Sequence, residues 1–592
     1  MKKCISILLM LFLVFGLVAC STGPLTKLDD PSDLEQERVV TFQNDKYDVR
    51  KVSLKYSDNT MEYKYNGYSQ TFAVQCPTFT IAGHTYSTAA APTVILEDKD
   101  RVVLSYLIRE GDISLDVLQY YEADVADGTM RMYVKVIPNG FGENCMLQKI
   151  ELQRIDIAQY GNYTSEHYGN TLNSYPAYFE NFFAAIEHPV SYNIYDAEGI
   201  VFAHCPGKTI VNGEMFVSRN LIIGLSEQGD AKYRFEHYIE QNRPTKAEKH
   251  TNYNSWWSLP TSPNESDILG LLDEIKTNLY DPYGVAFDSF CIDLGWSRLD
   301  GVWEINSEKY TNGNLDLINS KIQSMGMSMG LWISPSNMYS PMSFDNAWAK
   351  ANGYEVLPHP WTPGSYVMNI ALGSKYQKKL KKQLTEYVMH YKLGHIKFDG
   401  YWGSIDSLTP EGYPTGIYSM ELLADGMIDV FQACSEANPS IWMETTCFGA
   451  NASPFWLNYC SSVIGTFGDD APPGTIPSFD YRESLITSRD NYNLNGSDRL
   501  SSPVKYQEQL GIIHQGPEDF MNDAVSVIMR GNMFLPCYIN PYVYGKPAVK
   551  SMDKERWSKF AMLLRWFDKN YYQILETQAL RPADFIKESQ TH

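Results

Sequence analysis

The sequence predicts a multidomain protein in which an N-terminal antiparallel β-sandwich precedes a (β/α)8 TIM barrel. The chain has 592 residues, which is too long for one ordinary domain. Residues 38–248 consist of short strand-like segments separated by turn residues, whereas residues 249–575 alternate apolar strand candidates with amphipathic helix patterns. Hydrophobic residues make up 44% of the chain, which is enough to fill large cores.

The first residues have the pattern of a targeting segment. Lys2 and Lys3 precede an apolar stretch that ends in the sequence LVAC, with the cysteine at position 20. This pattern predicts a bacterial lipoprotein signal peptide over 1–19, lipidation of Cys20, and a polar tether over 20–37. An ordinary signal peptide is the alternative. We therefore expect an exported lipoprotein anchored to a cell membrane, on its periplasmic or cell-surface face.

The predicted β-sandwich rests on alternating strand patterns. Turn signals such as Ala126-Asp127-Gly128 and Pro138-Asn139-Gly140 fall between them, and long amphipathic helices are nearly absent. The clearest strand candidates are RVVLSYLI, LDVLQYYEADV, RMYVKVIP, MLQKIELQRIDIA and NLIIGL.

The predicted barrel rests on eight strand candidates separated by helical stretches. Helices are expected over 374–392, 416–437 and 553–573, where apolar residues recur every three or four positions. A doubly wound open sheet is the alternative topology. The strand candidates are 253–256, 285–293, 327–334, 395–400, 440–447, 461–469, 510–515 and 532–540.

Polar or reactive residues end five of these strand candidates in succession. In a barrel of this kind, catalytic residues lie at the C-terminal ends of the strands. One aspartate at a strand end is often only a turn former or a helix cap, but a series of such residues indicates a site. The series is Asp293, Trp332, Lys397 with Asp399, Cys447 and Asp469.

Two of these carboxylates suggest the cleavage of a glycosidic bond. That reaction needs one carboxylate as nucleophile and one carboxylic acid to protonate the leaving oxygen. Lys397 and Asp399 lie two positions apart in a strand and so share one side, where we expect Lys397 to keep Asp399 ionised as the nucleophile. Asp469 has no adjacent cation and is the candidate acid/base. A separation of about 5–5.5 Å between the two carboxylates would give the retaining mechanism.

Charge and motif content exclude several other functions. The formal net charge of −21 disfavours nucleic acid as a partner. No phosphate-binding loop, dinucleotide turn, HExxH sequence or EF-hand loop occurs, so we expect no cofactor. The cysteines form no CxxC pair, which indicates neither a metal site nor a disulfide framework. The expected partner is therefore an oligosaccharide or glycan, with the membrane contacted only through the lipid anchor.

The sequence resembles glycoside hydrolase family 36 and its clan, the α-galactosidases and α-N-acetylgalactosaminidases. The resemblance rests on an ordered series of short motifs over residues 160–545, and it implies a sandwich before a barrel. It implies Asp399 as nucleophile and Asp469 as acid/base. We expect the substrate to be bound by Lys397, Asp293, Trp332, Cys447, Trp256, Trp402 and Asp470. The matching motifs are Asn254-Ser255-Trp256, Phe290-Cys291-Ile292-Asp293, Gly330-Leu331-Trp332, Tyr366-Val367-Met368-Asn369, Ile396-Lys397-Phe398-Asp399 and Gly468-Asp469-Asp470.

This sequence departs from the family pattern more at the sugar-binding positions than at the catalytic pair. Leu294 stands where the family has a second aspartate, Ser334 replaces a glutamate, and Tyr401-Trp402 replaces Asn-Arg. The family's small C-terminal β-domain is expected to be absent or truncated, which leaves 576–592 as a remnant. We therefore predict a retaining exo-glycosidase for terminal α-galactosyl or α-N-acetylgalactosaminyl residues. The alternatives are a non-catalytic glycan-binding lipoprotein and a glycosidase of the same clan for another sugar.

Overall fold

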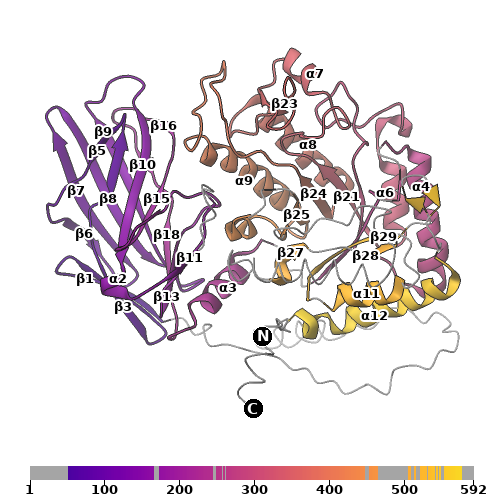
Figure 1. The fold of residues 1–592 in the computed structure, drawn as a ribbon, viewed down its shortest axis with the longest axis horizontal. Helices are drawn as coiled ribbons and strands as arrows, with labels where there is room; N and C mark the ends of the chain where they lie inside the picture. The colour runs from indigo at the N-terminus through magenta and orange to yellow at the C-terminus, as the bar shows by residue number, and fades with distance from the viewer. Residues whose placement is uncertain are drawn as a thin grey trace, which may run out of the picture.

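The fold has two parts that lie side by side. Figure 1 shows a β-sandwich on the left and a barrel surrounded by helices on the right, with helix α3 (Ala231–Asn242) between them. This arrangement confirms the predicted fold class. The computed structural model describes residues 51–165, 173–244, 249–256, 258–259, 262–446, 448, 452–464, 504–508, 512–514, 520–529, 531–539, 542–543, 546–547 and 552–575.

Antiparallel sheets build the first part. One sheet has the order β1-β2-β3, a second β14-β15-β10-β4-β5 and a third β11-β12-β13-β18-β9-β8-β7-β6, while β16 and β17 pair at the side of β10 and β9. The strands are β1 (Val52–Ser57), β2 (Thr60–Tyr65), β3 (Tyr68–Ala73), β4 (Thr78–Ile81), β5 (His84–Tyr86), β6 (Thr93–Glu97), β7 (Arg101–Glu110), β8 (Ile113–Ala123), β9 (Met130–Asn139), β10 (Met146–Asp156), β11 (Thr164–Ser165), β12 (Ala177–Tyr178), β13 (Phe182–Ile186), β14 (Ile194–Tyr195), β15 (Gly199–His204), β16 (Lys208–Thr209), β17 (Phe216–Val217) and β18 (Leu221–Leu225).

The alternating strand patterns place one apolar face of each large sheet in a shared core. Along β9 every second residue is buried, so Met130, Met132, Val134 and Val136 point to one side. These side chains belong to the same buried cluster as Ile150 of β10, which lies in the other large sheet. The five strand candidates of the sequence correspond to β7, β8, β9, β10 and β18.

Parallel strands form the sheet of the second part. Their order is β27-β26-β25-β24-β21-β20-β19-β29-β28, and the residues that would join β27 to β28 lie outside the described ranges. Seven of the eight predicted barrel strands contain one of these strands, and the eighth, 253–256, overlaps only the last two residues of β19. Strand β27 was not predicted because it is short and polar. The strands are β19 (His250–Asn254), β20 (Ser289–Ile292), β21 (Ser328–Ile333), β24 (His395–Asp399), β25 (Trp442–Thr446), β26 (Ser462–Ile464), β27 (Gln507–Glu508), β28 (Ile512–His514) and β29 (Phe534–Ile539).

Helices follow most of these strands and cover the outside of the barrel (Figure 1). The three predicted helices are present as α8, α9 and α12. Ser374 caps α8, because its hydroxyl accepts a hydrogen bond from the amide of Gln377. The remaining elements are α2 (Ile157–Tyr160), α4 (Glu265–Ile275), η3 (Lys276–Tyr280), α5 (Asp281–Tyr283), η4 (Thr311–Gly313), α6 (Asp316–Gln323), α7 (Asn346–Ala351), α8 (Lys375–Tyr391), α9 (Met420–Ala437), η5 (Pro454–Asn458), η6 (Val504–Tyr506), α11 (Phe520–Ile528) and α12 (Lys554–Leu575), with the hairpins β22 (Val356–Pro358)–β23 (Tyr366–Met368) and β30 (Tyr542–Val543)–β31 (Lys546–Pro547).

Stacked rings fill the N-terminal end of the barrel. The first residue of each of three strands contributes a ring: His250, His395 and Trp442, with ring centroids 4.8–5.2 Å apart along the stack. Burial lowers the pKa of both histidines to about 3, so both are neutral at physiological pH. This end of the barrel is therefore a packed structural layer.

Charged side chains join the sandwich to helix α9. Arg219, between β17 and β18, donates to Glu421 at 3.0 Å and to both oxygens of Asp425 at 2.6 and 2.7 Å. His204 Nδ1 lies 3.0 Å from Glu421. Burial raises the pKa of both carboxyl groups, but the histidine and arginine partners outweigh it and lower each pKa below its usual value. Both carboxylates are therefore ionised where the two parts meet.

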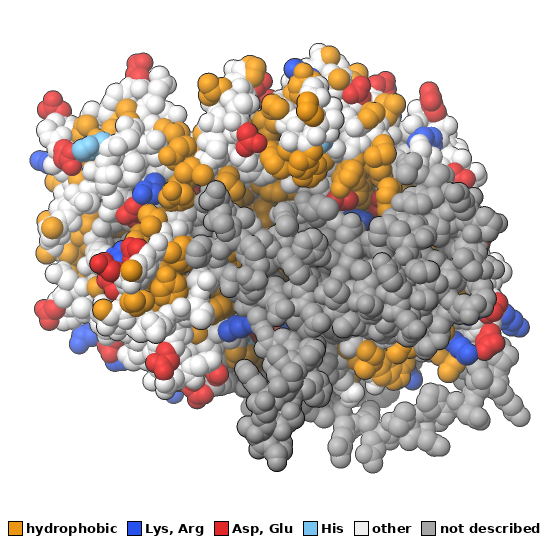
Figure 2. Space-filling view, in the orientation of Figure 1, with side chains coloured by type: hydrophobic (Ala, Val, Ile, Leu, Met, Phe, Trp, Pro, Cys, Tyr) orange, Lys and Arg blue, Asp and Glu red, His pale blue; other side chains and the backbone are white. Residues whose placement is uncertain are grey.

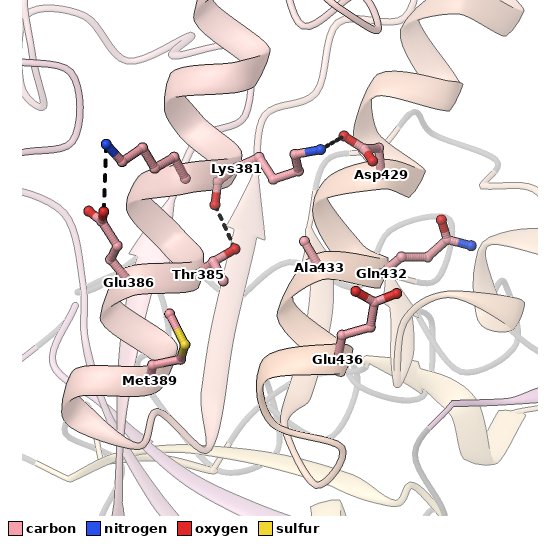
Figure 3. Close-up of a pocket in the computed structure, with 9 residues that line it drawn as sticks. Lys381, Thr385, Glu386, Met389, Asp429, Gln432, Ala433 and Glu436 are labelled. Atoms are coloured by element: carbon pink, nitrogen blue, oxygen red, sulfur yellow. Dashed lines mark hydrogen bonds and ion pairs between the residues drawn. The ribbon is translucent and has the colours of Figure 1, made fainter.

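A groove runs between α8 and α9 on the outer face of the barrel (Figure 3). Lys381 of α8 spans it and forms an ion pair with Asp429 of α9 at 2.7 Å. None of the strand-end residues that the structure describes, Asp293, Trp332, Lys397 and Asp399, lines this groove. It is therefore separate from the candidate site described next.

Candidate active site

Asp399 is the last residue of β24, at the C-terminal end of the barrel strands. Each carboxylate oxygen accepts one hydrogen bond: Oδ2 from Trp332 Nε1 at 3.1 Å, and Oδ1 from the Tyr339 hydroxyl at 2.9 Å. Burial raises the pKa of Asp399 above its usual value, while Lys397 and these two donors act in the opposite direction. The carboxylate is thus fixed in orientation by a donor on each oxygen.

The ion pair of Lys397 is formed with Asp293. Its ammonium lies 3.3 Å from Asp293 Oδ2, and both side chains are buried. We expected Lys397 to keep Asp399 ionised, and the structure agrees only in part. Lys397 does lower the pKa of Asp399, but burial has the larger effect and the net shift is upward.

Further acidic and polar groups keep Lys397 charged. Burial alone lowers the pKa of a lysine, but Asp293, Tyr538 and Glu444 raise that of Lys397 well above its usual value. Glu444 lies on β25 directly opposite Lys397 in the register of the two strands. The centre of the barrel therefore holds a lysine that stays protonated and an aspartate paired to it.

Trp332 supports the nucleophile candidate from a buried position. It is the penultimate residue of β21 and is only 2% exposed. Its ring packs against that of Tyr339, with ring centroids 5.5 Å apart. Its backbone carbonyl accepts a hydrogen bond from Trp296 Nε1 at 3.0 Å. We expected Trp332 to bind substrate, which stays a prediction; in this structure its indole donates to the carboxylate of Asp399.

A glycine allows the chain to turn directly after Asp399. Gly400 has a φ of +79°, and a Cβ at this position would lie 3.0 Å from Ser334 Oγ and 3.1 Å from Tyr339 Cε2. The following residues then point to different surroundings. Tyr401 stacks on Phe448 at 4.9 Å inside the barrel loops, whereas Trp402 donates its amide to Ser336 Oγ at 2.7 Å.

Two predicted site tryptophans follow β19 and β24. Trp256 comes two residues after β19, where its amide donates to Asn254 Oδ1 at 2.8 Å and its ring packs beside Tyr538. Trp402 packs its ring against Trp361 with centroids 6.2 Å apart and an interplanar angle of 80°. Both therefore follow barrel strands at the end where Asp399 lies.

Several predicted site residues lie outside the described ranges. These are the acid/base candidate Asp469, its neighbour Asp470, Cys447 and the lipidation site Cys20. The separation between the carboxyl groups of Asp399 and Asp469 stays a prediction. Strand β26, which precedes Asp469 in the chain, pairs with β25 in the same parallel sheet as Asp399.

Two residues of this site, Tyr339 and Glu444, were not predicted from the sequence. Glu444 lies in the middle of an apolar strand and is 2% exposed, so the rule that singled out Lys397 applies to it equally. Tyr339 lies in the loop after β21, where no local pattern distinguishes a tyrosine that binds a carboxylate from any other.

The fold is similar to that of several solved structures of glycoside hydrolases. A substituted α-galactosidase of family 36 from Geobacillus stearothermophilus, solved in complex with raffinose, is 14% identical, with a TM-score of 0.55 over 95% of this chain and 82% of that chain. The α-galactosidase from Lactobacillus brevis is 10% identical, with a TM-score of 0.56 over 94% and 78%. The galactosidase domain of an α-galactosidase–sucrose kinase is 13% identical, with a TM-score of 0.54 over 91% and 77%.

These similarities concern the fold. No protein-family model matches the chain, and no curated protein matches it. The chain has the fold of family 36 α-galactosidases, as the sequence resemblance implied. At such low identities the activity has to be argued from the site itself.

Proposed function

We propose that this protein is a retaining exo-glycosidase that removes terminal α-galactosyl or related α-N-acetylgalactosaminyl residues. The observation that carries the proposal is the environment of Asp399. A carboxylate at a barrel strand end, with one donor on each oxygen and a charged Lys397–Asp293 pair beside it, suits a nucleophile that attacks a sugar. The family 36 fold agrees with this chemistry.

The reaction proceeds in two displacements. An oxygen of Asp399 attacks the anomeric carbon, the bond to the leaving oxygen breaks, and the carboxylic acid of Asp469 gives that oxygen its proton. In the second step Asp469 takes a proton from water as the water attacks the anomeric carbon, and Asp399 is released as a carboxylate. The indole of Trp332 and the hydroxyl of Tyr339 orient Asp399 for both steps.

The Lys397–Asp293 pair is the candidate contact for the sugar hydroxyls. The ammonium donates hydrogen bonds and the carboxylate accepts them, so together they match hydroxyl groups, which do both. Leu294 follows Asp293 with its side chain buried, at the position where the resemblance implies a second carboxylate. The hydroxyl contacts at this position therefore differ from those of the family, and the proposal includes sugars related to galactose.

A non-catalytic glycan-binding protein is the competing candidate, and Leu294 and Ser334 are the observations that favour it. Ser334 is buried and donates to the carbonyl oxygen of Gly400 at 3.3 Å, so it supports the turn after Asp399. A glycosidase of the same clan with another sugar specificity, for example for β-L-arabinopyranosides, is the third candidate. Product formation separates the first and third candidates from the second, and a panel of aryl glycosides separates the first from the third.

The test combines a panel of aryl glycosides with product analysis. We expect hydrolysis of an α-galactoside or α-N-acetylgalactosaminide, with the α-anomer as the first product in NMR spectra. Asp399→Ala should lose turnover by at least about 1,000-fold and regain part of it with azide, because azide replaces the missing carboxylate as nucleophile. Undiminished turnover by Asp399→Ala contradicts the proposal, and binding without product supports the second candidate.

We further propose that the protein acts as an exported lipoprotein. The proposal is supported by the charged, apolar and cysteine pattern that ends at Cys20. Metabolic labelling with a radioactive fatty acid should mark the full-length protein and not its Cys20→Ser variant. Equal labelling of both proteins contradicts lipidation at this residue.

A further inference from the structure

An exposed tryptophan lies in the loop between β22 and β23. Trp361 is 73% exposed, and this loop belongs to the connection between barrel strands β21 and β24. Hydrophobic side chains also gather on the surface around β23, as Figure 2 shows. A single exposed apolar residue needs no explanation, so the inference depends on how this loop is held and what Trp361 faces.

His359 fixes the loop that carries Trp361. Its Nδ1 accepts hydrogen bonds from the amides of Trp361 at 3.2 Å and Thr362 at 3.1 Å. These two donors leave Nε2 to carry the proton, and Nε2 donates to the carbonyl oxygen of Met338 at 3.2 Å. Met338 is the neighbour of Tyr339, which binds Asp399. The loop is therefore attached to the segment that orients the nucleophile candidate.

Trp402 reaches the same place from a different strand end. It lies three residues after Asp399, and its amide is bound by Ser336, whose own amide donates to the carbonyl oxygen of Gly400 at 3.3 Å. The Trp361 and Trp402 rings are nearly perpendicular, at 80°, with centroids 6.2 Å apart. Two separately anchored loops thus form an aromatic corner beside the turn that follows Asp399.

An aromatic corner of this kind suits a pyranose ring. The face of a sugar ring carries axial C–H groups, which pack on an aromatic face, and a second ring at a right angle limits how the sugar is oriented. Both loops are already held by hydrogen bonds, so the binding of a sugar would order few additional groups. The loss of conformational entropy on binding is therefore small.

We infer that Trp361 and Trp402 form a subsite for the leaving-group sugar of an oligosaccharide substrate. The inference rests on the proposed function, because the sugar bound here is the one that departs when Asp399 attacks. It adds to that function a preference for oligosaccharides over substrates whose leaving group has no ring.

The test compares two substrates that share the glycosyl group. Raffinose releases sucrose, whereas α-galactosyl fluoride releases only fluoride ion. In Trp361→Ala the ratio of kcat/KM for raffinose to kcat/KM for the fluoride should fall about tenfold, the effect of one lost stacking face. Trp402→Ala should change the ratio in the same direction, and Trp361→Phe should change it less. Trp566→Ala, on α12, is the matched control and should leave the ratio as it is.

The outcomes separate this inference from the proposed function. A ratio within twofold of that of the unmodified protein, or equal losses on both substrates, overturns the aromatic subsite even when the enzyme is active. If the unmodified protein cleaves neither substrate, the α-galactosidase part of the proposed function fails and the leaving-group role of the corner fails with it. Calorimetric binding of raffinose that weakens about tenfold in Trp361→Ala then shows a sugar-binding site without that role, and unchanged or undetectable binding overturns the corner as a sugar site altogether.

Discussion

Removing the hydroxyl of Tyr339 should shift the acidic limb of the pH–rate profile to higher pH. In Tyr339→Phe, Asp399 Oδ1 loses the 2.9 Å hydrogen bond that stabilises its ionised form. A hydrogen bond to a charged group contributes about 1.5–3 kcal/mol, and one pKa unit corresponds to about 1.4 kcal/mol. The pKa of Asp399, which burial already raises, should therefore increase by a further one to two units, about the ratio of these energies.

The assay is the pH dependence of kcat/KM for an aryl α-galactoside, which reports the ionisation of the free enzyme. Because the nucleophile must be ionised, a higher pKa reduces activity at low pH and leaves the plateau at higher pH less affected. Tyr366→Phe is the matched control, since the Tyr366 hydroxyl meets Lys350 on the surface and not Asp399. An acidic limb that stays within about 0.3 units in Tyr339→Phe would refute the role of this hydrogen bond, since the energies above require a larger shift.

Three further predictions concern stability and charge pairing. Asp399→Asn should unfold at a higher temperature than the unmodified protein at pH 7, because an aspartate whose pKa is raised in the folded state destabilises that state once it is ionised. In thermal scans this gain should vanish below a pH of about 4, the pKa of aspartate in the unfolded chain, because the side chain is then protonated in both states. Arg219→Ala should lower the free energy of unfolding in urea by about 3–5 kcal/mol, since it leaves Glu421 and Asp425 with only their histidine partners at the contact between sandwich and barrel. The exposed control Arg298→Ala should change it by less than about 1 kcal/mol. Lys397→Met should destabilise the fold by a similar amount of about 3–5 kcal/mol, and adding Asp293→Asn should recover most of this stability in urea titrations without restoring turnover; additive losses in the double variant would contradict the pairing.

The fold was predictable because its main signals are local. Alternation along residues 131–138 and the apolar stretch at 395–400 each indicate a strand without knowledge of its partners, and β9 and β24 cover these segments. The short polar strand β27 carries no such signal. Its pairing with β26 depends on the position of the whole barrel, so local patterns could not predict it.

The sequence was sufficient to predict several residues of the site, but not which of them contact one another. Alternation along β24 places Lys397 and Asp399 on one side of the strand. Their spacing of two positions is enough to predict this. The partner of Lys397 is Asp293, 104 residues earlier in the chain, and that pairing follows from how β20, β21 and β24 align. The upward pKa shift of Asp399 likewise depends on burial by distant segments. The spacing of residues in the sequence therefore could not predict whether the pKa of Asp399 is raised or lowered.

The charged contact between the sandwich and helix α9 limits how the protein can be shortened for expression. A chain that starts at the barrel would expose Glu421 and Asp425 without Arg219, His204 or His188 to balance them. The backbone around Tyr418 would also lose the close approach of Gly207, where no larger residue fits. The barrel therefore depends on the sandwich for its stability, and truncated versions that omit the sandwich should be recovered as aggregates.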